Sequence, residues 1–286
     1  MLPEYSTQTA TNRTPLEDFI TDLDMHLNGG TKLKSIKRAS GISLSPEGFK
    51  RQDTVNGDLR KTFGNPTPVG LLGILLSLTP LSCDLIGWRG AGGNGAASVG
   101  AYLFFGGLLL IISGLLEFSL GNTFPFVVFM SFGAFWLSYG ITLQPSYNAY
   151  TAYAPTNSTS STAGLATKGF NASFGFLMLF MGVLCLVFLI CSLRTNVVYV
   201  VVFSTLVVAF GLLTGLHFQL AVGNADLAAG LQVAAGFALL VTSIATWWIF
   251  IATMLEALDF PFQIPVGDLS WIIKGANSCL EEDSLA

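Results

Sequence analysis

The sequence predicts an all-α membrane protein with six transmembrane helices and both termini in the cytoplasm. Hydrophobic residues make up 52% of the 286 residues and charged residues only 10%, whereas a soluble globular protein carries about 25% charged residues. The charges are also unevenly placed, because only six charged side chains fall between residues 62 and 255. This pattern argues against a soluble enzyme, and the formal net charge of -4 argues against a nucleic-acid partner.

Six stretches are long enough to cross a bilayer, since a spanning helix needs about 20 mainly apolar residues. In chain order they cover residues 69–88, 97–120, 124–143, 170–193, 197–220 and 228–255. The first is the weakest, because Pro80 interrupts it and Asp84 stands near its end. The joints at residues 121–123 and 194–196 are very short, so they predict antiparallel helix hairpins. The last stretch is long enough to tilt.

Lysine and arginine predict which end of the bundle faces the cytoplasm, because short cytoplasmic loops collect these residues. Nine of the 13 basic residues precede the first stretch, so we expect the N-terminus inside. Six spans then return the C-terminus to the same side. The expected outer loop of residues 144–169 agrees, since Asn157-Ser158-Thr159 matches the glycosylation acceptor pattern. Asn157 is therefore the glycosylation candidate.

This layout divides the chain into three parts. They are a cytoplasmic tail of residues 1–62, a six-helix transmembrane channel or transporter domain of residues 63–256, and a cytoplasmic tail of residues 257–286. In the first tail, Thr14-Pro15-Leu16-Glu17 is typical of a helix start, and apolar residues follow at helical spacing. A short amphipathic helix lying on membrane lipid is one interpretation, and a mostly disordered, solvated tail is the other.

Little in the sequence supports catalysis or a bound cofactor. The two histidines are His26 in the tail and His217 near the outer end of the fifth stretch. His217 has no acidic residue near it in the sequence, so we interpret it as an interfacial residue. The four cysteines show no spacing typical of a disulfide framework or a zinc site. We therefore expect no enzyme activity, no cofactor and no metal.

The expected interior of the bundle is nearly free of ionisable groups. Ion pumps and proton-coupled carriers place such groups at mid-membrane, so the sequence favours a narrow neutral path. Glu117 ends the second span and Arg194 follows the fourth, so both are expected at the cytoplasmic rim, where they can pair. The remaining polar groups are mostly hydroxyls, which either line the path or bond to their own helix backbone.

The strongest local feature is Asn65-Pro66-Thr67-Pro68-Val69-Gly70-Leu71 at the start of the first span. The two prolines remove two backbone donors and disfavour helix before them, and Asn65 can cap the helix that follows. We expect Asn65, Pro66, Pro68 and Gly70 to form a non-helical pore mouth. Its backbone N–H groups would be left free.

This segment resembles the Asn-Pro-x-Pro-x-Gly-Leu signature of the acetate uptake transporter family, also called succinate–acetate permeases. Further segments resemble the family's second-to-third helix junction, its third helix and the C-terminal segment of its fungal members. They are Gly114-Leu115-Leu116-Glu117, Phe132-Gly133-Ala134-Phe135-Trp136-Leu137-Ser138 and Pro265-Val266-Gly267-Asp268. The resemblance spans about residues 63–268, and the long basic tail indicates the fungal branch.

The resemblance implies the passage of acetate, and of other short carboxylates such as succinate, across the plasma membrane of a fungal cell. It implies a homo-oligomer, a hexamer with one pore per subunit. Combined with the neutral interior, it favours a channel-like path or weak proton-coupled symport that is faster at acid pH. Two alternatives stay open, namely ammonium or ammonia export and a membrane sensor that transports nothing.

The resemblance also implies where the pore narrows. Counting from the family motifs places the constriction at Ile74, Phe132 and Thr205, and only Phe132 keeps the family's residue type there. On the third span, the further candidates for lining the pore are Phe135, Ser138 and Tyr139.

Overall fold

A computed structural model describes residues 63–269 of the chain except 157, 159 and 161. It has six helical spans long and apolar enough to cross a membrane: Thr67–Ile86, Gly95–Ser119, Thr123–Leu143, Lys168–Ser192, Val197–Ala221 and Ala225–Ala257. The described residues contain no strand, only an isolated antiparallel bridge between Asn196 and Asp268. The predicted all-α fold with six spans is confirmed. The helix expected in the N-terminal tail and the glycosylation candidate Asn157 lie outside the described residues.

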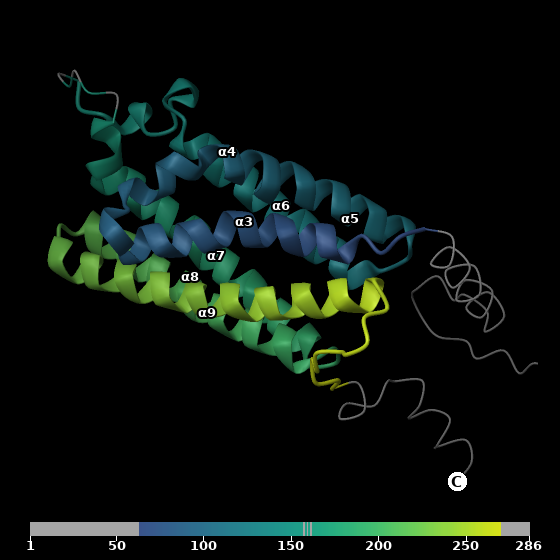
Figure 1. Cartoon of the computed structure of the whole chain (residues 1–286). Helices are drawn as coiled ribbons and strands as arrows, with labels where there is room; N and C mark the ends of the chain where they lie inside the picture. The colour runs from purple at the N-terminus through teal and green to yellow at the C-terminus, as the bar shows by residue number, and fades with distance from the viewer. Residues whose placement is uncertain (1–62, 157, 159, 161, 270–286) are drawn as a thin grey trace, which may run out of the picture. The chain divides into compact units, whose positions relative to one another are not determined.

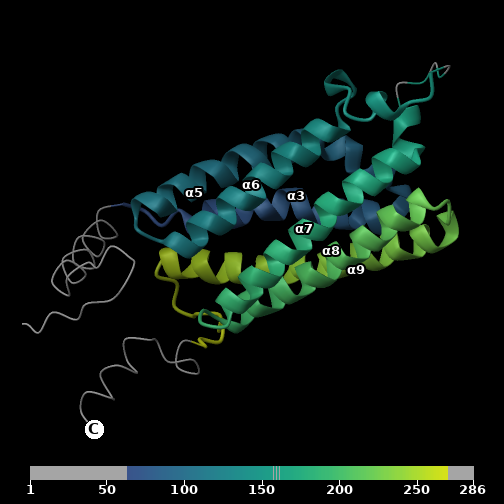
Figure 2. The same cartoon turned by 180° about the vertical axis from the view of Figure 1, so that it is seen from behind.

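Figures 1 and 2 show the elements in two opposite views. Five spans are the single helices α3 (Thr67–Ile86), α6 (Thr123–Leu143), α7 (Lys168–Ser192), α8 (Val197–Ala221) and α9 (Ala225–Ala257). The second span joins η2 (Gly93–Ser98), α4 (Val99–Ala101), η3 (Tyr102–Leu109) and α5 (Leu110–Ser119). Short 3₁₀ turns fill the loops: η1 (Trp88–Gly90), η4 (Pro145–Tyr147), η5 (Thr151–Tyr153) and η6 (Ala163–Ala166).

Polar side chains begin three of the long helices, because the first N–H groups of a helix have no partner within it. The Thr167 hydroxyl accepts from the third N–H of α7 at 3.4 Å, and Asn196 Oδ1 accepts from Tyr199 N–H of α8 at 2.9 Å. Asn224 Oδ1 does the same for α9 at 3.4 Å. α3 ends where Gly87 takes a left-handed conformation with φ of 80°. Local sequence thus sets where these helices begin and end.

α3 lies between the α5–α6 pair and α9 (Figure 1), and it packs against both. α7 packs on α8, and α8 packs on α9 (Figure 2). The two very short joints therefore do connect packed neighbours, α5 with α6 and α7 with α8, as the sequence predicted. α3 and α9 are also linked by side chains, since the Thr79 and Ser243 hydroxyls lie 2.6 Å apart and Trp247 Nε1–H donates to Thr79 Oγ1 at 3.3 Å.

The C-terminal segment docks on the turn between α7 and α8. Val197 N–H donates to the Gly267 carbonyl at 2.8 Å, and Leu269 N–H donates to the Thr195 carbonyl at 3.0 Å. Trp248 Nε1–H donates to the Pro265 carbonyl at 3.0 Å. These bonds fasten the chain that leaves α9 back onto the helix bundle.

The second span contains a π-helix, η3, that the sequence did not predict. An apolar run gives no sign of it, and two glycines, Gly106 and Gly107, lie inside it. A Cβ atom on Gly106 would lie 2.6 Å from both Ser77 Oγ and Trp136 Cγ. α3 and α6 therefore approach the second span as closely as its bare backbone allows.

The outward surface of the bundle is strongly apolar, as lipid contact requires. Phe104 is 66% exposed and Phe180 is 67% exposed, on the second span and on α7. A soluble protein rarely presents contiguous apolar surface on this scale. The exposed side chains are therefore suited to contact with the hydrocarbon core of a bilayer, in agreement with six membrane spans.

Replacing Gly106 with Ala should destabilise the fold by about 1–3 kcal/mol, because the added methyl group overpacks the contact with Trp136. The matched control is Gly211→Ala in α8, where a Cβ atom would meet nothing within 4 Å. We expect the control to raise stability by about 0.5–1 kcal/mol, because Ala favours a helix over Gly where the methyl group has room. Thermal unfolding of both purified variants in detergent measures the difference, and equal melting temperatures would contradict the close packing.

Candidate functional site

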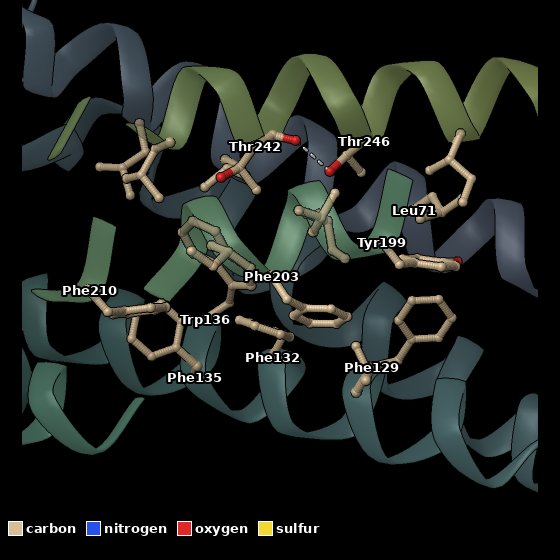
Figure 3. A pocket seen from close by; sticks show the side chains of 18 of the residues that line it. Leu71, Phe129, Phe132, Phe135, Trp136, Tyr199, Phe203, Phe210, Thr242 and Thr246 are labelled. Atoms are coloured by element: carbon tan, nitrogen blue, oxygen red, sulfur yellow. Dashed lines mark hydrogen bonds between the residues drawn. The ribbon is translucent and has the colours of Figure 1, made fainter. Parts of the chain in front are cut away.

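The central cavity lies inside the bundle between α3, α6, α8 and α9 and has a volume of about 60 Å³. Figure 3 shows that its walls are mainly aromatic rings and aliphatic side chains. The lining residues include Leu71, Ile74, Leu78 and Leu81 of α3; Phe129, Phe132, Phe135 and Trp136 of α6; Tyr199, Phe203, Leu206, Phe210 and Leu213 of α8; and Thr242 and Thr246 of α9. This is the position in which a path through the bundle is expected.

Two of the three expected constriction residues line the central cavity. Ile74 and Phe132 face it from opposite helices, α3 and α6, and Phe132 is buried with 7% exposure. Thr205 does not line it. Its Oγ1 lies 2.7 Å from Thr242 Oγ1, so it joins α8 to α9, and the next residue, Leu206, lines the cavity in its place. Neighbouring residues of a helix point about 100° apart. Leu206 therefore faces the cavity, while Thr205 faces α9.

The polar groups at the central cavity are few and neutral. Thr246 donates to the Thr242 carbonyl at 2.8 Å, and Thr242 donates to the Ala238 carbonyl at 3.1 Å. Both hydroxyls thus follow the alternative interpretation, bonding to their own helix. None of the described residues that line this cavity is charged. A bare ion would gain nothing here to replace its hydration.

A second cavity, the His217 cavity, lies between α3, α6, α7, α8 and α9 and has a volume of about 120 Å³. It shares Leu81, Phe135 and Leu213 with the central cavity, so these three side chains separate the two spaces. Its polar lining residues are Tyr139, Thr142, Asn171, His217 and Gln232.

The sequence did not predict the His217 cavity, because its polar side chains come from separate helices. His217 was interpreted as standing alone, but its Nδ1 lies 3.1 Å from Asn171 Oδ1. The Asn171 Nδ2 in turn donates to the Leu165 and Thr167 carbonyls at 2.8 and 3.0 Å. The one available signal was that His217 is the sole imidazole within the predicted spans.

The candidates on the third span divide between these cavities and the outer surface. Phe135 lines both cavities and Tyr139 lines the His217 cavity. Ser138 lines neither, because it is exposed and donates to the Ala134 carbonyl of its own helix at 2.8 Å. A pore-lining role for Ser138 stays a prediction, and in the structure its hydroxyl bonds to backbone.

A third cavity, the mouth cavity, lies at the start of α3 and has a volume of about 310 Å³. Phe63, Gly64, Asn65, Thr67, Leu120 and Asn122 line it. Asn65 is exposed there, whereas Pro66, Pro68 and Gly70 are buried. A Cβ atom on Gly70 would lie 2.6 Å from Phe129 Cε2. The prolines and this glycine therefore shape the mouth by packing rather than by facing the solute.

Three backbone N–H groups of the mouth are paired, although the prediction had them free. Thr67 N–H donates to Asn65 Oδ1 at 3.0 Å. Val69 and Gly70 N–H donate to the Pro66 carbonyl at 3.0 and 3.3 Å. Proline has no N–H to offer. The mouth therefore has fewer free backbone N–H groups than the sequence predicted.

Glu117 connects three helices beside the mouth. Its side chain is fully buried, with 0% exposure. The Thr67 hydroxyl donates to Oε1 and the Asn122 Nδ2 donates to Oε2, each at 2.5 Å. Ser113 Oγ donates to the Pro66 carbonyl nearby at 2.8 Å. The carboxyl group thus joins the start of α3, the end of α5 and the start of α6.

The structure gives Glu117 other partners than the Arg194 guanidinium that the sequence suggested. Arg194 is exposed in the turn between α7 and α8. Both oxygens of Glu117 already accept hydrogen bonds from neutral groups. A buried network of this kind costs less than a buried carboxyl group without partners.

Glu117→Ala should destabilise the protein by about 1–3 kcal/mol, because it leaves the Thr67 hydroxyl and the Asn122 amide without their acceptor. Glu117→Gln should cost less, since a Gln oxygen can accept from Asn122 and a hydroxyl can reverse to accept from the Gln amide. Glu256→Ala, at an exposed position near the end of α9, is the matched control. Thermal unfolding gives the order, and a Gln variant as unstable as the Ala variant would contradict the network.

Comparisons with known proteins agree with the resemblance seen in the sequence. The model of the GPR1/FUN34/yaaH family matches residues 52–271. The protein alcS of Aspergillus fumigatus is 44% identical over 236 residues, which cover 81% of this chain and 86% of the relative. The acetate transporter protein patA of Aspergillus clavatus is 30% identical and covers 72% of this chain and 79% of its own length.

The chain is also similar to a yeast protein and to one solved structure. The ammonia transport outward protein 3 of Saccharomyces cerevisiae is 32% identical over 48% of this chain and 54% of its own length. The structure of the bacterial acetate channel SatP matches with a TM-score of 0.50 and 27% identity, covering 72% of this chain and 99% of that chain.

Proposed function

The chain belongs to the GPR1/FUN34/yaaH family of integral membrane proteins, and we propose that it carries acetate across the membrane through the central cavity. Two of its relatives support this solute, since one is named an acetate transporter and the other an acetate channel. The observation that carries the proposal is the narrow central cavity of about 60 Å³, lined without a charged side chain among the described residues.

The lining of the cavity favours a solute without net charge. A carboxylate would lose its hydration between the rings of Phe132, Phe203 and Trp136 with no basic group to replace it. Acetic acid has a carboxyl group like that of Glu, whose pKa is about 4.3. The undissociated fraction therefore falls about a hundredfold between pH 5 and pH 7. The proposed passage is channel-like or weakly proton-coupled and is faster at acid pH.

Succinate is a poorer candidate than acetate for this path. It has two carboxyl groups to neutralise in a cavity where no described lining residue is charged. The hexamer and the location in a fungal plasma membrane, both implied by the family resemblance, belong to this proposal as well.

Uptake of labelled acetate by liposomes that contain the purified protein tests the proposal. We expect uptake above that of protein-free liposomes at pH 5, and a much lower initial rate at pH 7 at the same total acetate. The undissociated acid is scarcer at pH 7, which is the physical reason for the difference. Rates equal to those of protein-free liposomes at both pH values would overturn the proposal.

Phe132→Ala should change the acetate flux or the selectivity between acetate and larger carboxylates, because it removes a ring from the wall of the central cavity. The matched control is Phe180→Ala on α7, where the ring is 67% exposed to the outside of the bundle. Competition of unlabelled carboxylates with acetate uptake measures selectivity. If both variants keep the parent profile, Phe132 has no part in the path.

Ammonium or ammonia export is the second candidate, and it is favoured by the similarity to an ammonia transport outward protein. A neutral cavity also suits ammonia, which carries no charge. The two candidates differ in one measurable respect. An ammonia path should sustain outward ammonium flux from liposomes that contain no carboxylate, whereas an acetate path should not.

A further inference from the structure

The Asn171 amide determines which ring nitrogen of His217 carries a proton. The Asn171 Nδ2 donates to the Leu165 and Thr167 carbonyls at 2.8 and 3.0 Å. Its Oδ1 is the atom that lies 3.1 Å from His217 Nδ1. Because an amide oxygen can only accept, Nδ1 must carry the proton and donate it. In the neutral ring, Nε2 is then an acceptor.

Two polar groups of the His217 cavity have no hydrogen-bond partner among the described residues. One is His217 Nε2 on α8, since the ring bonds only through Nδ1. The other is the carboxamide of Gln232 on α9, which lines the same cavity. An acceptor and a carboxamide left open in one cavity are complementary to a molecule that has both a donor and an acceptor.

We propose that the His217 cavity binds a short monocarboxylic acid in its undissociated form. The acid O–H donates to His217 Nε2, and the Gln232 carboxamide donates to the acid carbonyl oxygen. The alkyl group lies toward Phe135 and Leu213, which the cavity shares with the central cavity. This inference rests on the proposed transport of acetate. It identifies a binding site for the solute next to the central cavity.

The lining of the His217 cavity requires that the carboxylic acid keep its proton when it binds. Among the described residues that line the cavity, the other titratable group is Tyr139, with which Asp84 of α3 interacts electrostatically. α7 contributes Asn171 and aromatic rings, and α9 contributes Gln232. No fixed positive charge is present in this lining to hold a bare carboxylate. The dissociation constant for total acetate should therefore rise about tenfold for each pH unit above the pKa of the acid.

Nitrogen-15 NMR on the full chain tests the site directly. The chain has two histidines, so His26→Asn leaves His217 as the single imidazole. With labelled histidine in lipid nanodiscs, we expect a protonated Nδ1 and an unprotonated Nε2 before acetate is added. Acetate at pH 5 should shift the Nε2 resonance to saturation, with an apparent Kd about tenfold weaker at pH 6. An unprotonated Nδ1, or an Nε2 resonance that acetate leaves unchanged, would overturn the inference.

Two variants extend the test by equilibrium binding of labelled acetate. His217→Phe and Gln232→Leu should each raise the apparent Kd about tenfold, since each removes one hydrogen bond to the acid. Gln219→Leu, on α8 outside the lining of the cavity, is the matched control and should keep the parent Kd. Unchanged affinity in both test variants would contradict the site. The NMR measurement leaves His217 and Gln232 intact, so it decides the question even if a variant does not fold.

The site and the transport proposal fail in different ways. Liposomes without acetate uptake would overturn transport, while a saturable shift of Nε2 would still establish the site. Normal uptake with an unchanged Nε2 resonance would overturn the site and leave transport standing.

Discussion

The constraint on which this structure depends is the absence of water from the bilayer core. A polar group there must find its partner within the protein or carry a large cost. The buried Glu117 meets the constraint through Thr67 and Asn122, and in doing so it joins three helices at the mouth. Hydroxyls such as Thr246 meet it by bonding to the preceding turn of their own helix. Where the helices approach without polar groups, glycines such as Gly106 allow backbone and ring to touch.

The same constraint shapes the path. Because the Thr242 and Thr246 hydroxyls bond to their own helix and no described lining residue is charged, the central cavity offers a solute mainly apolar contact. An anion would have to give up its hydration without compensation, whereas an undissociated acid would not. His217 and Gln232 each line one cavity with a polar group that has no partner among the described residues, and the buried Tyr102 hydroxyl also lacks a partner there. His217 and Gln232 differ from Tyr102 in lining a cavity, where a ligand can supply the missing partner.

The spans could be predicted from the sequence because an apolar run of about 20 residues is typical of a transmembrane helix. The π-helix at Tyr102–Leu109 could not, since an apolar run has the same pattern in an α-helix and in a π-helix, and the close contacts of its glycines with other helices leave no pattern in the chain. The resemblance placed Phe132 at the central cavity, but one step of helical rotation moved Thr205 away from it. The pairing of His217 with Gln232 in one cavity could not be predicted from the sequence. A cavity built from separate helices leaves no local pattern in the chain.

Electroneutral passage of the solute is the central claim, and the membrane potential tests it most directly. Liposomes with the protein can be given an inside-positive, zero or inside-negative potential by a potassium gradient and valinomycin, at constant pH. If acetate crosses together with its proton, the initial rate of uptake should be the same at all three potentials, and the lumen should acidify as acetate enters. A rate that rises at inside-positive potential and falls at inside-negative potential, without acidification, would show that the bare anion crosses and would contradict the account.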